Sequence, residues 1–481
     1  MCDHFPLYRG NLEYFCLGCD ARFDINELLY TCPTCGSVLL LEDKNFSLLG
    51  RKSGKEWQEI FDGRAACKID ALRGIFRFYE LIAPVLDEED IIYLGEGNTP
   101  IIKANQELQK EIGLRFAIKN EGQNPSASFK DRGMACAFSY LQALARRHNR
   151  EEILTICAST GDTSASAALY ASYLGGAVKS VVLLPQGKVT PQQLGQPLGN
   201  GATVIELPGV FDDCMKVVEN LSRNYRVALL NSKNAWRILG QESYAYELAG
   251  WRNWDMRKLC VFVPIGNAGN ITAILNGFLK LRALDIIDGL PRIFGVQSAH
   301  ADPIFQYYNR GRDFAPVQVR PSVAQAAMIG NPVSFPRVRR LVELYCRRYV
   351  PQAGEKAFQV VQVTEQEIMD CMLMANRHGH IVCTQGGETL AGLRVALRHA
   401  LIGPDEFAVL NSTAHALKFA GFQQLYFEDA FPPEYEITPG RDLKNAPLSI
   451  FSADRKASLP EEEYIEQAAR AVAATLGLKS R

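Results

Sequence analysis

The feature that most limits the fold of this chain is a repeated alternation of short apolar runs with longer helix-like segments. The apolar runs cover residues 116–119, 153–157, 181–184, 203–207, 228–230, 259–263, 293–296 and 407–410. Runs of this kind indicate strands that are buried on both faces, and the helical segments between them indicate parallel neighbours. The sequence therefore predicts an α/β fold with a mostly parallel sheet covered by helices.

The composition is that of a large globular chain with no charge bias. A length of 481 residues suggests roughly two to four domains, and 47% hydrophobic residues allow a large core. The net charge of −1 gives no field that would attract nucleic acid or an anionic membrane. We expect neither a signal peptide nor a membrane span. Thirteen cysteines, mostly scattered, favour reduced thiols and a cytoplasmic location.

Four cysteines near the start form two Cys-x2-Cys pairs, Cys16 with Cys19 and Cys32 with Cys35. Pairs at this spacing can bring four thiolates into the tetrahedral geometry of structural zinc. The sequence predicts a zinc-ribbon-like module over residues 1–45, with these four residues as metal ligands. The alternatives are a ribbon that no longer holds metal and unliganded thiols. A closed four-cysteine site leaves no open position for catalysis, so we interpret the module as structural.

The loop Asn124–Arg132 carries Lys130 at an expected turn from the strand 116–119 into a long helix. Small residues and Phe129 would surround the amine, and desolvation would disfavour its charged form. A lysine held in this way can form a Schiff base with a carbonyl cofactor. Taken alone, the motif is better explained by a solvated lysine, because most lysines are exposed. The other motifs of the chain reverse that preference.

Three further motifs lie where open parallel sheets bind ligands, at the carboxyl ends of strands. Residues 159–164 offer hydroxyls and backbone amides to an anion, although an ordinary N-cap would look the same. Residues 264–270, Pro-Ile-Gly-Asn-Ala-Gly-Asn, could close backbone amides on a phosphate, with a plain turn as the alternative. They do not read Gly-x-Gly-x-x-Gly, which disfavours a nicotinamide cofactor. Residues 411–418 could present a hydroxyl to a ring nitrogen or only cap a helix.

In this order, the motifs resemble those of the threonine synthase family, pyridoxal-phosphate enzymes of the tryptophan-synthase-β-like (fold type II) group. The match runs from the Leu-Gly-Glu-Gly-Asn-Thr-Pro segment at 94–100 to Lys418. It includes the stretch Asn231–Arg237 and the pair Gly240–Gln241, and a cysteine ribbon also occurs in some members. The resemblance implies a catalytic domain over residues 46–430 with two lobes, each built on a mostly parallel sheet.

The smaller lobe would cover residues of about 131–240, inserted in the larger one. Beyond residue 430, Pro-Pro and Pro-Gly turn signals break the alternation, so we expect a C-terminal extension over residues 431–481. Within it, Leu459–Leu478 predicts a helix that packs on the body, and a disordered tail is the alternative.

For the site, the resemblance implies that Lys130 forms the Schiff base with pyridoxal phosphate and shuttles protons. Thr413 would hydrogen-bond the pyridine nitrogen. The cofactor phosphate would be bound by Gly266, Asn267, Ala268, Gly269 and Asn270. The carboxylate or phosphate of the substrate would be held by Ser159, Thr160, Thr163, Asn231 and Arg237. Arg237 also has a physical case, because a guanidinium matches a phosphate bidentately; a surface salt bridge is its alternative.

Two positions depart from the family pattern. Asp162 stands where many relatives carry asparagine. The resemblance implies that this residue binds the cofactor, beside the phenolic oxygen of pyridoxal phosphate. An ionised carboxylate there would repel a phenolate unless the two share a proton, although aspartate does occur in another branch of the family. The second departure is the segment Gln385–Thr389, where relatives often read Thr-Gly followed by apolar residues. Its Glu388 could shape the site or cap a helix.

The resemblance implies a carbon–oxygen lyase that converts O-phospho-L-homoserine and water to L-threonine and phosphate. Its expected partner is a small phosphorylated amino acid, with neither nucleic acid nor membrane, and a homo-oligomer is compatible with the sequence. The nearest alternative is a β-elimination or β-replacement enzyme acting on serine, threonine or phosphoserine, such as a dehydratase or a cysteate synthase. Asn231 and Arg237 favour a phosphorylated substrate over that alternative.

A second alternative is a zinc-ribbon binding protein with a degenerate enzyme body. Between Cys16 and Cys35 the sequence has one cationic residue, Arg22, and three acidic residues. A ribbon of this charge supports nucleic-acid binding poorly.

Overall fold

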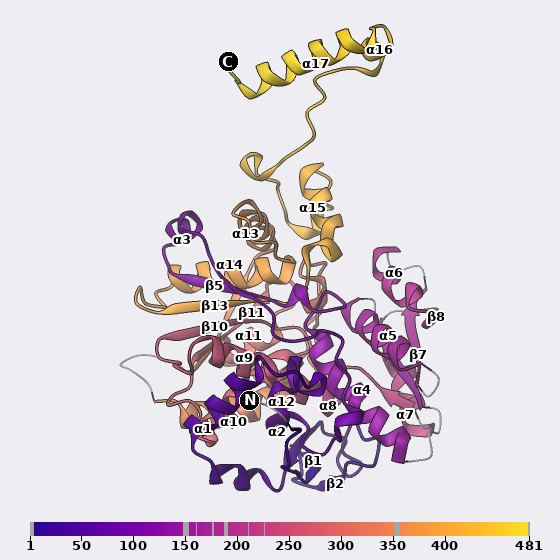
Figure 1. Cartoon of the computed structure of the whole chain (residues 1–481), viewed down its shortest axis with the longest axis vertical. Helices are drawn as coiled ribbons and strands as arrows, with labels where there is room; N and C mark the ends of the chain where they lie inside the picture. Colours follow the sequence, from indigo (N-terminus) through magenta and orange to yellow (C-terminus); the bar gives the residue numbers. More distant parts are fainter. Residues whose placement is uncertain are drawn as a thin grey trace.

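The structure is a computed structural model that describes residues 4–147, 153–159, 161–175, 178–186, 191–209, 211–225, 227–350 and 356–479. Within these residues the strands form three sheets of six, four and three strands. The six-stranded and four-stranded sheets lie side by side, and the three-stranded sheet lies at the opposite end of the body from the C-terminal segment (Figure 1).

The larger sheet has the strand order β12-β11-β10-β13-β5-β4, and all neighbours are parallel except β4 with β5. The strands are β4 (Ile101–Lys103), β5 (Phe116–Asn120), β10 (Leu259–Pro264), β11 (Arg292–Ser298), β12 (Phe358–Val363) and β13 (Phe407–Ser412). Every residue of β10 and β11 is buried, as expected for central strands without polar alternation.

Helices cover both faces of this sheet (Figure 1). On one side lie α13 (Glu365–Arg377) and α14 (Thr384–Arg398), and α14 packs across four of the strands. On the other side lie α9 (Ser243–Trp251), α10 (Gly269–Ala283) and α12 (Phe335–Arg348). Four further helices are α1 (Gly54–Arg64), α2 (Tyr79–Ile82), α3 (Gln106–Ile112) and α11 (Pro303–Arg310).

The smaller parallel sheet has the order β8-β7-β6-β9. Its strands are β6 (Ile153–Ala158), β7 (Val178–Pro185), β8 (Thr203–Leu207) and β9 (Val227–Leu229). The helices around it are α4 (Lys130–Arg147), α5 (Asp162–Leu174), α6 (Pro191–Gly199), α7 (Phe211–Asn224) and α8 (Ala235–Gln241). Each predicted apolar run overlaps a strand, so the predicted α/β class with two parallel sheets is confirmed; β4 and β12 were not predicted.

The N-terminal residues form an antiparallel sheet of β1 (Leu12–Cys16), β2 (Arg22–Asp24) and β3 (Leu39–Asp43). This sheet shares the main hydrophobic cluster of the body. The Trp236 indole donates to the Tyr14 hydroxyl at 3.0 Å, and Tyr140 stacks on Trp236 with ring centroids 3.9 Å apart. The N-terminal sheet is therefore packed into the body by aromatic contacts.

The C-terminal segment contains α15 (Ala420–Phe427), α16 (Ala453–Ala457) and α17 (Glu461–Leu476). The predicted helix within Leu459–Leu478 is confirmed, but its predicted packing on the body is wrong. No residue of α17 is buried, and the helix stands away from the body, next to α16 (Figure 1). Its apolar face is mostly alanine, which offers little area to offset the entropy of ordering a tether.

In the described part of the chain, no helix has both the length and the apolarity that a membrane span requires.

Arg337 on α12 tests how the N-terminal sheet is held. Its guanidinium is fully buried and donates to the carbonyl oxygens of Leu39, Ser232 and Lys233 at 2.5 to 3.0 Å. We expect Arg337→Met to lower the free energy of unfolding by at least about 2 kcal/mol, because buried acceptors lose their donor. Denaturant unfolding should show this loss. The exposed Arg339 on the same helix provides the control, Arg339→Met, and equal stability of the two variants would contradict the assignment.

Candidate active site

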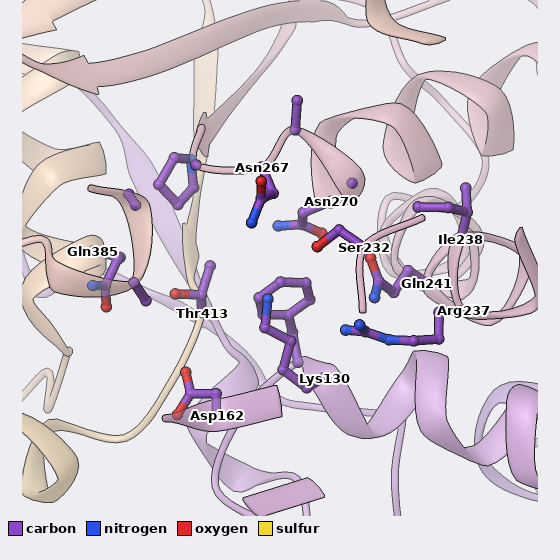
Figure 2. Close-up of a pocket in the computed structure, with 17 residues that line it drawn as sticks. Lys130, Asp162, Ser232, Arg237, Ile238, Gln241, Asn267, Asn270, Gln385 and Thr413 are labelled. Carbon is purple, nitrogen blue, oxygen red and sulfur yellow. The ribbon is translucent and has the colours of Figure 1, made fainter. Parts of the chain in front are cut away.

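A cavity that is partly open to solvent lies at the carboxyl ends of the parallel strands. Figure 2 shows the side chains that line it, which come from both parallel sheets and their helices. The lining consists of Phe129, Lys130, Asp162, Ser232, Arg237, Ile238, Gln241, Pro264, Gly266, Asn267, Ala268, Gly269, Asn270, Ala326, Ala327, Gln385 and Thr413.

Lys130 begins α4 at the cavity wall, and its preceding loop is joined to the segment after β13. The Phe129 amide donates to the Thr413 carbonyl at 2.9 Å, and the His415 amide donates to the Ala127 carbonyl at 3.0 Å. Ala127 has a left-handed backbone with φ of 62°, which turns the chain sharply before the helix. These contacts hold Lys130 and Thr413 on the same side of the cavity.

The Lys130 amine lies 4.3 Å from the centre of the Phe129 ring. Burial, followed by the nearby Arg237 guanidinium, lowers the pKa of Lys130 to about 7. Asp162 opposes this by raising the pKa, while Lys418 again lowers it. An amine with a pKa near neutrality can act as a nucleophile and as a proton carrier.

Beneath the lysine, the first turn of α4 is held by a buried network of ion pairs. Arg132 donates to Glu121 and to Glu247 at 2.6 to 2.9 Å. Lys119 donates to Glu247 at 2.7 Å and to the Thr99 hydroxyl at 2.8 Å. The network joins the end of β5, the start of α4 and helix α9. It fixes the helix turn from which Lys130 projects.

The turn between β10 and α10 forms a cup of backbone amides at the top of the cavity (Figure 2). A Cβ atom on Gly266 would lie 2.9 Å from both the Ala326 carbonyl oxygen and the Ala327 Cα, so only glycine fits there. Ala268 has φ of 62°, and α10 begins at Gly269. Among the described residues, the buried Asn270 Nδ2 has no hydrogen-bond partner. A helix N-terminus with free donors suits an anionic group.

Arg237 faces the amine from α8 (Figure 2). It can approach because α8 packs closely on α4: a Cβ atom on Gly240 would lie 2.2 Å from the Arg132 carbonyl oxygen. Its Nη1 donates to the Leu230 carbonyl at 2.6 Å, and its buried Nε has no partner among the described residues. Burial lowers the pKa of Arg237 to about 10. The surface salt bridge considered from the sequence is therefore wrong, and the guanidinium is available to an anion in the cavity.

The structure does not bring every predicted substrate-binding residue to the described cavity wall. Ser159, Thr163 and Asn231 are absent from the lining, and Thr160 lies outside the described residues. The Asn231 amide bonds the backbone of Ala158, accepting from its N–H at 3.1 Å and donating to its carbonyl at 2.7 Å. This contact joins the ends of β6 and β9, and the substrate roles of these residues stay predictions.

Several lining residues were not singled out from the sequence. Ser232 and Gln241 lie within segments that carried the resemblance, but the pattern marked the segments and not the side chains. Ala326 and Ala327 follow no motif and reach the cavity only through the fold. Gln385 lines the cavity, whereas Glu388, one turn further along α14, is fully buried behind it. The capping interpretation of Glu388 is wrong, because α14 is capped by another residue, Cys383, whose sulfur accepts from the Gly386 amide.

Away from the cavity, the sulfur atoms of Cys16, Cys19, Cys32 and Cys35 all lie within 4.8 Å of one another. The sulfur of Cys16 lies 3.4 Å from that of Cys35, and the sulfur of Cys19 lies 3.6 Å from that of Cys32. Four sulfurs around a zinc ion, each about 2.3 Å from it, would be about 3.8 Å apart. The four thiols therefore fit a tetrahedral metal.

The sequence matches the family described as pyridoxal-phosphate dependent enzyme over residues 92–413. It is 36% identical to threonine synthase of Methanocaldococcus jannaschii over 84% of this chain and 92% of that protein. It is 32% identical to chloroplastic threonine synthase 2 of Arabidopsis thaliana, over 82% and 74% respectively. The crystal structure of Escherichia coli threonine synthase shares the fold, with a TM-score of 0.66 and 19% identity over 93% of this chain and 95% of that one.

The low pKa of Lys130 can be tested by its reactivity. We expect a lysine-selective acylating reagent to modify Lys130 with a half-point near pH 7, because the neutral amine is the nucleophile and its pKa is about 7. Peptide mapping across a pH series measures this. The exposed Lys110 on α3 is an internal control for the reagent. Arg237→Met should raise the Lys130 half-point, and a wild-type half-point for Lys130 near about 10.4, the ordinary value of a lysine, would contradict the structure.

Proposed function

Because this chain belongs to the pyridoxal-phosphate-dependent enzyme family, we propose that it converts O-phospho-L-homoserine and water to L-threonine and phosphate. The observation that carries the proposal is one cavity lined by the Lys130 amine, the amide cup at 266–270, Thr413 and Arg237. An amine of low pKa, an anion cup and a second, separate cation are what a phosphorylated cofactor and a phosphorylated substrate require together.

The residues of the cavity fit the cofactor. A side chain at position 266 would not fit beside the backbone amides of the cup. Among the described residues, the buried Asn270 Nδ2 has no acceptor, so it can donate to a bound group. Lys130 would hold the cofactor covalently, the cup at 266–270 would bind its phosphate, and Thr413 would face its ring nitrogen. When bound, pyridoxal phosphate supplies an electron sink for charge that develops on the substrate carbons.

Each remaining step falls to side chains of this chain. The Lys130 amine would take the proton from Cα and release it to solvent, and would then carry a proton from Cβ to Cγ as phosphate leaves, for which a pKa near 7 is suited. Arg237 binds the phosphate and stabilises its charge as it leaves from Cγ. Water then gives its hydroxyl to Cβ and its remaining proton to the released phosphate, and Cα regains a proton through Lys130. Because Arg237 is buried, its ion pair with phosphate is screened less by solvent than a surface pair would be.

The substrate class is tested by comparing O-phosphohomoserine, phosphoserine and serine, with phosphate release and the amino-acid product as readouts. We expect turnover of the first, and Lys130→Ala to abolish it by about 1,000-fold or more. Arg237→Met should lower kcat/KM for phosphohomoserine by about 10- to 100-fold, the value of a charged hydrogen bond, with little effect on any turnover of serine. Lys110→Ala is the control. Turnover of serine alone would instead establish the β-elimination alternative.

We also propose that the four cysteines hold a structural zinc ion. The support is the mutual proximity of the sulfurs, 4.8 Å or less, and the spacing of the two Cys-x2-Cys pairs. The site lies between strands of the N-terminal sheet, which is packed into the body, so its role is to fix that sheet.

Metal content tests this proposal. The purified protein is expected to contain about one zinc ion per chain, and Cys35→Ser should lose it and melt about 5 °C lower or more. Elemental analysis and thermal unfolding measure the two effects. Cys346→Ser is the matched control, because Cys346 is an exposed free thiol outside the cluster. Full zinc occupancy in Cys35→Ser would refute the assignment.

The finer organisation belongs to the same proposal. We propose that the chain is divided into a zinc-ribbon-like module over residues 1–45, a catalytic domain over 46–430 and an extension over 431–481. The smaller lobe of the catalytic domain would cover residues of about 131–240. A cytoplasmic location is supported by the twelve cysteines of the described residues, none of which forms a disulfide. A net charge of −1 supports the absence of a nucleic-acid partner. A homo-oligomer is compatible with this scheme.

A further inference from the structure

An ion pair at the edge of the cavity joins segments that the sequence separates widely. The Lys418 amine donates to the Asp162 carboxylate at 2.9 Å, across 256 residues of chain. Asp162 is the first residue of α5, beside the four-stranded sheet, and Lys418 follows β13 of the six-stranded sheet. The exposed fractions of the two side chains are 6% for Asp162 and 19% for Lys418, so solvent screens the pair only partly.

The pair lies next to the reactive amine. Figure 2 shows the Asp162 side chain beside Lys130 and close to Thr413. Asp162 and Lys418 act on Lys130 with opposite signs, the carboxylate favouring a charged amine and the ammonium disfavouring it. The other charged groups around the pair are Arg237, which also disfavours the charge on Lys130, and Asp131, whose carboxylate Lys418 stabilises.

A lone carboxylate in this position would disturb the chemistry. It would repel a phenolate oxygen of the cofactor and would hold Lys130 in its protonated form. An uncharged amide, as in asparagine, would do neither. Pairing with a cation removes the net charge of the carboxylate while its oxygen atoms stay in place to accept hydrogen bonds.

We propose that Lys418 is a positioning residue that neutralises Asp162, so that the ion pair presents the cavity with no net charge and takes the place of an amide. This inference rests on the proposed function for the identity of the group beside Asp162. It adds a residue that contacts Asp162 from the opposite sheet and acts on the reaction through it. The pair also fixes the two sheets relative to each other at the cavity edge.

Removal of the Lys418 charge and removal of the Asp162 charge should shift the half-point of Lys130 acylation in opposite directions. Lys418→Met should raise the half-point of Lys130 acylation by about one pKa unit, and Asp162→Asn should lower it by a similar amount. The double variant should return to within about 0.3 unit of the wild type, because the net charge is again zero. Lys418→Arg keeps the positive charge and should leave the half-point at the wild-type value. Lys216→Met, which removes an exposed partner of Asp213, should leave the half-point unchanged.

The same variants loaded with pyridoxal phosphate provide a second readout. The pH at which their visible absorption changes should shift with the same signs as the half-point of acylation. A double variant that keeps the shift of Lys418→Met, or single variants that shift in one direction, would overturn the proposal. So would a Lys418→Met variant with an unchanged half-point and a raised KM for phosphohomoserine, which would mean that Lys418 binds substrate.

Failure of the proposed function gives a different result. A wild-type protein without a chromophore or turnover would refute the function, whereas the acylation series on the cofactor-free protein would still decide whether Lys418 balances Asp162. If Lys418→Met does not fold, as shown by its unfolding transition, Lys418→Gln and Asp162→Asn decide the question by the same opposite shifts.

Discussion

Two buried cations and two buried carboxylates meet beneath the turn that carries Lys130, and the geometry of the site depends on them. Burial alone would raise the pKa of Glu247, but Arg132 and Lys119 hold it well below its ordinary value. Taking four charges out of water is costly, and removal of one partner from such a set typically costs about 3–5 kcal/mol. The network therefore specifies one arrangement of β5, α4 and α9. A chain that lost one member would lose the fixed direction of the Lys130 side chain.

Charged side chains also balance one another in the cavity. Arg237 lowers the pKa of Lys130 and, being buried with a donor unpaired among the described residues, is also available to a phosphate. Under the proposed function, this one side chain would serve two requirements: it lowers the pKa of Lys130, and it would bind the phosphate of the substrate. The pair of Asp162 with Lys418 adds a carboxylate without adding net charge. Burial makes each of these charges effective, because solvent screens them little.

Much of this arrangement was predictable from local patterns. The apolar runs gave eight of the ten strands that the described residues form in the two larger sheets. Glycines, small residues and a lysine marked the turns that follow three of these strands, including Lys130 and the cup at 266–270. The direction of individual side chains was less predictable. Asn231 was expected to bind substrate, yet its amide is bonded to Ala158 on the neighbouring strand. Helix formation in α17 followed from composition, whereas its separation from the body did not, because docking depends on the surface available to receive it.

The sequence by itself determined the class of fold, the order of the motifs and the spacing of the cysteines. These features are local, since a strand, a turn or a metal knuckle is set by neighbours a few residues away. Only the tertiary structure decided that Lys418 lies against Asp162, that Arg337 holds Leu39 and that Ala326 closes on Gly266. Such contacts join residues many positions apart, and their energies depend on burial and on the path of the chain, which no local pattern encodes.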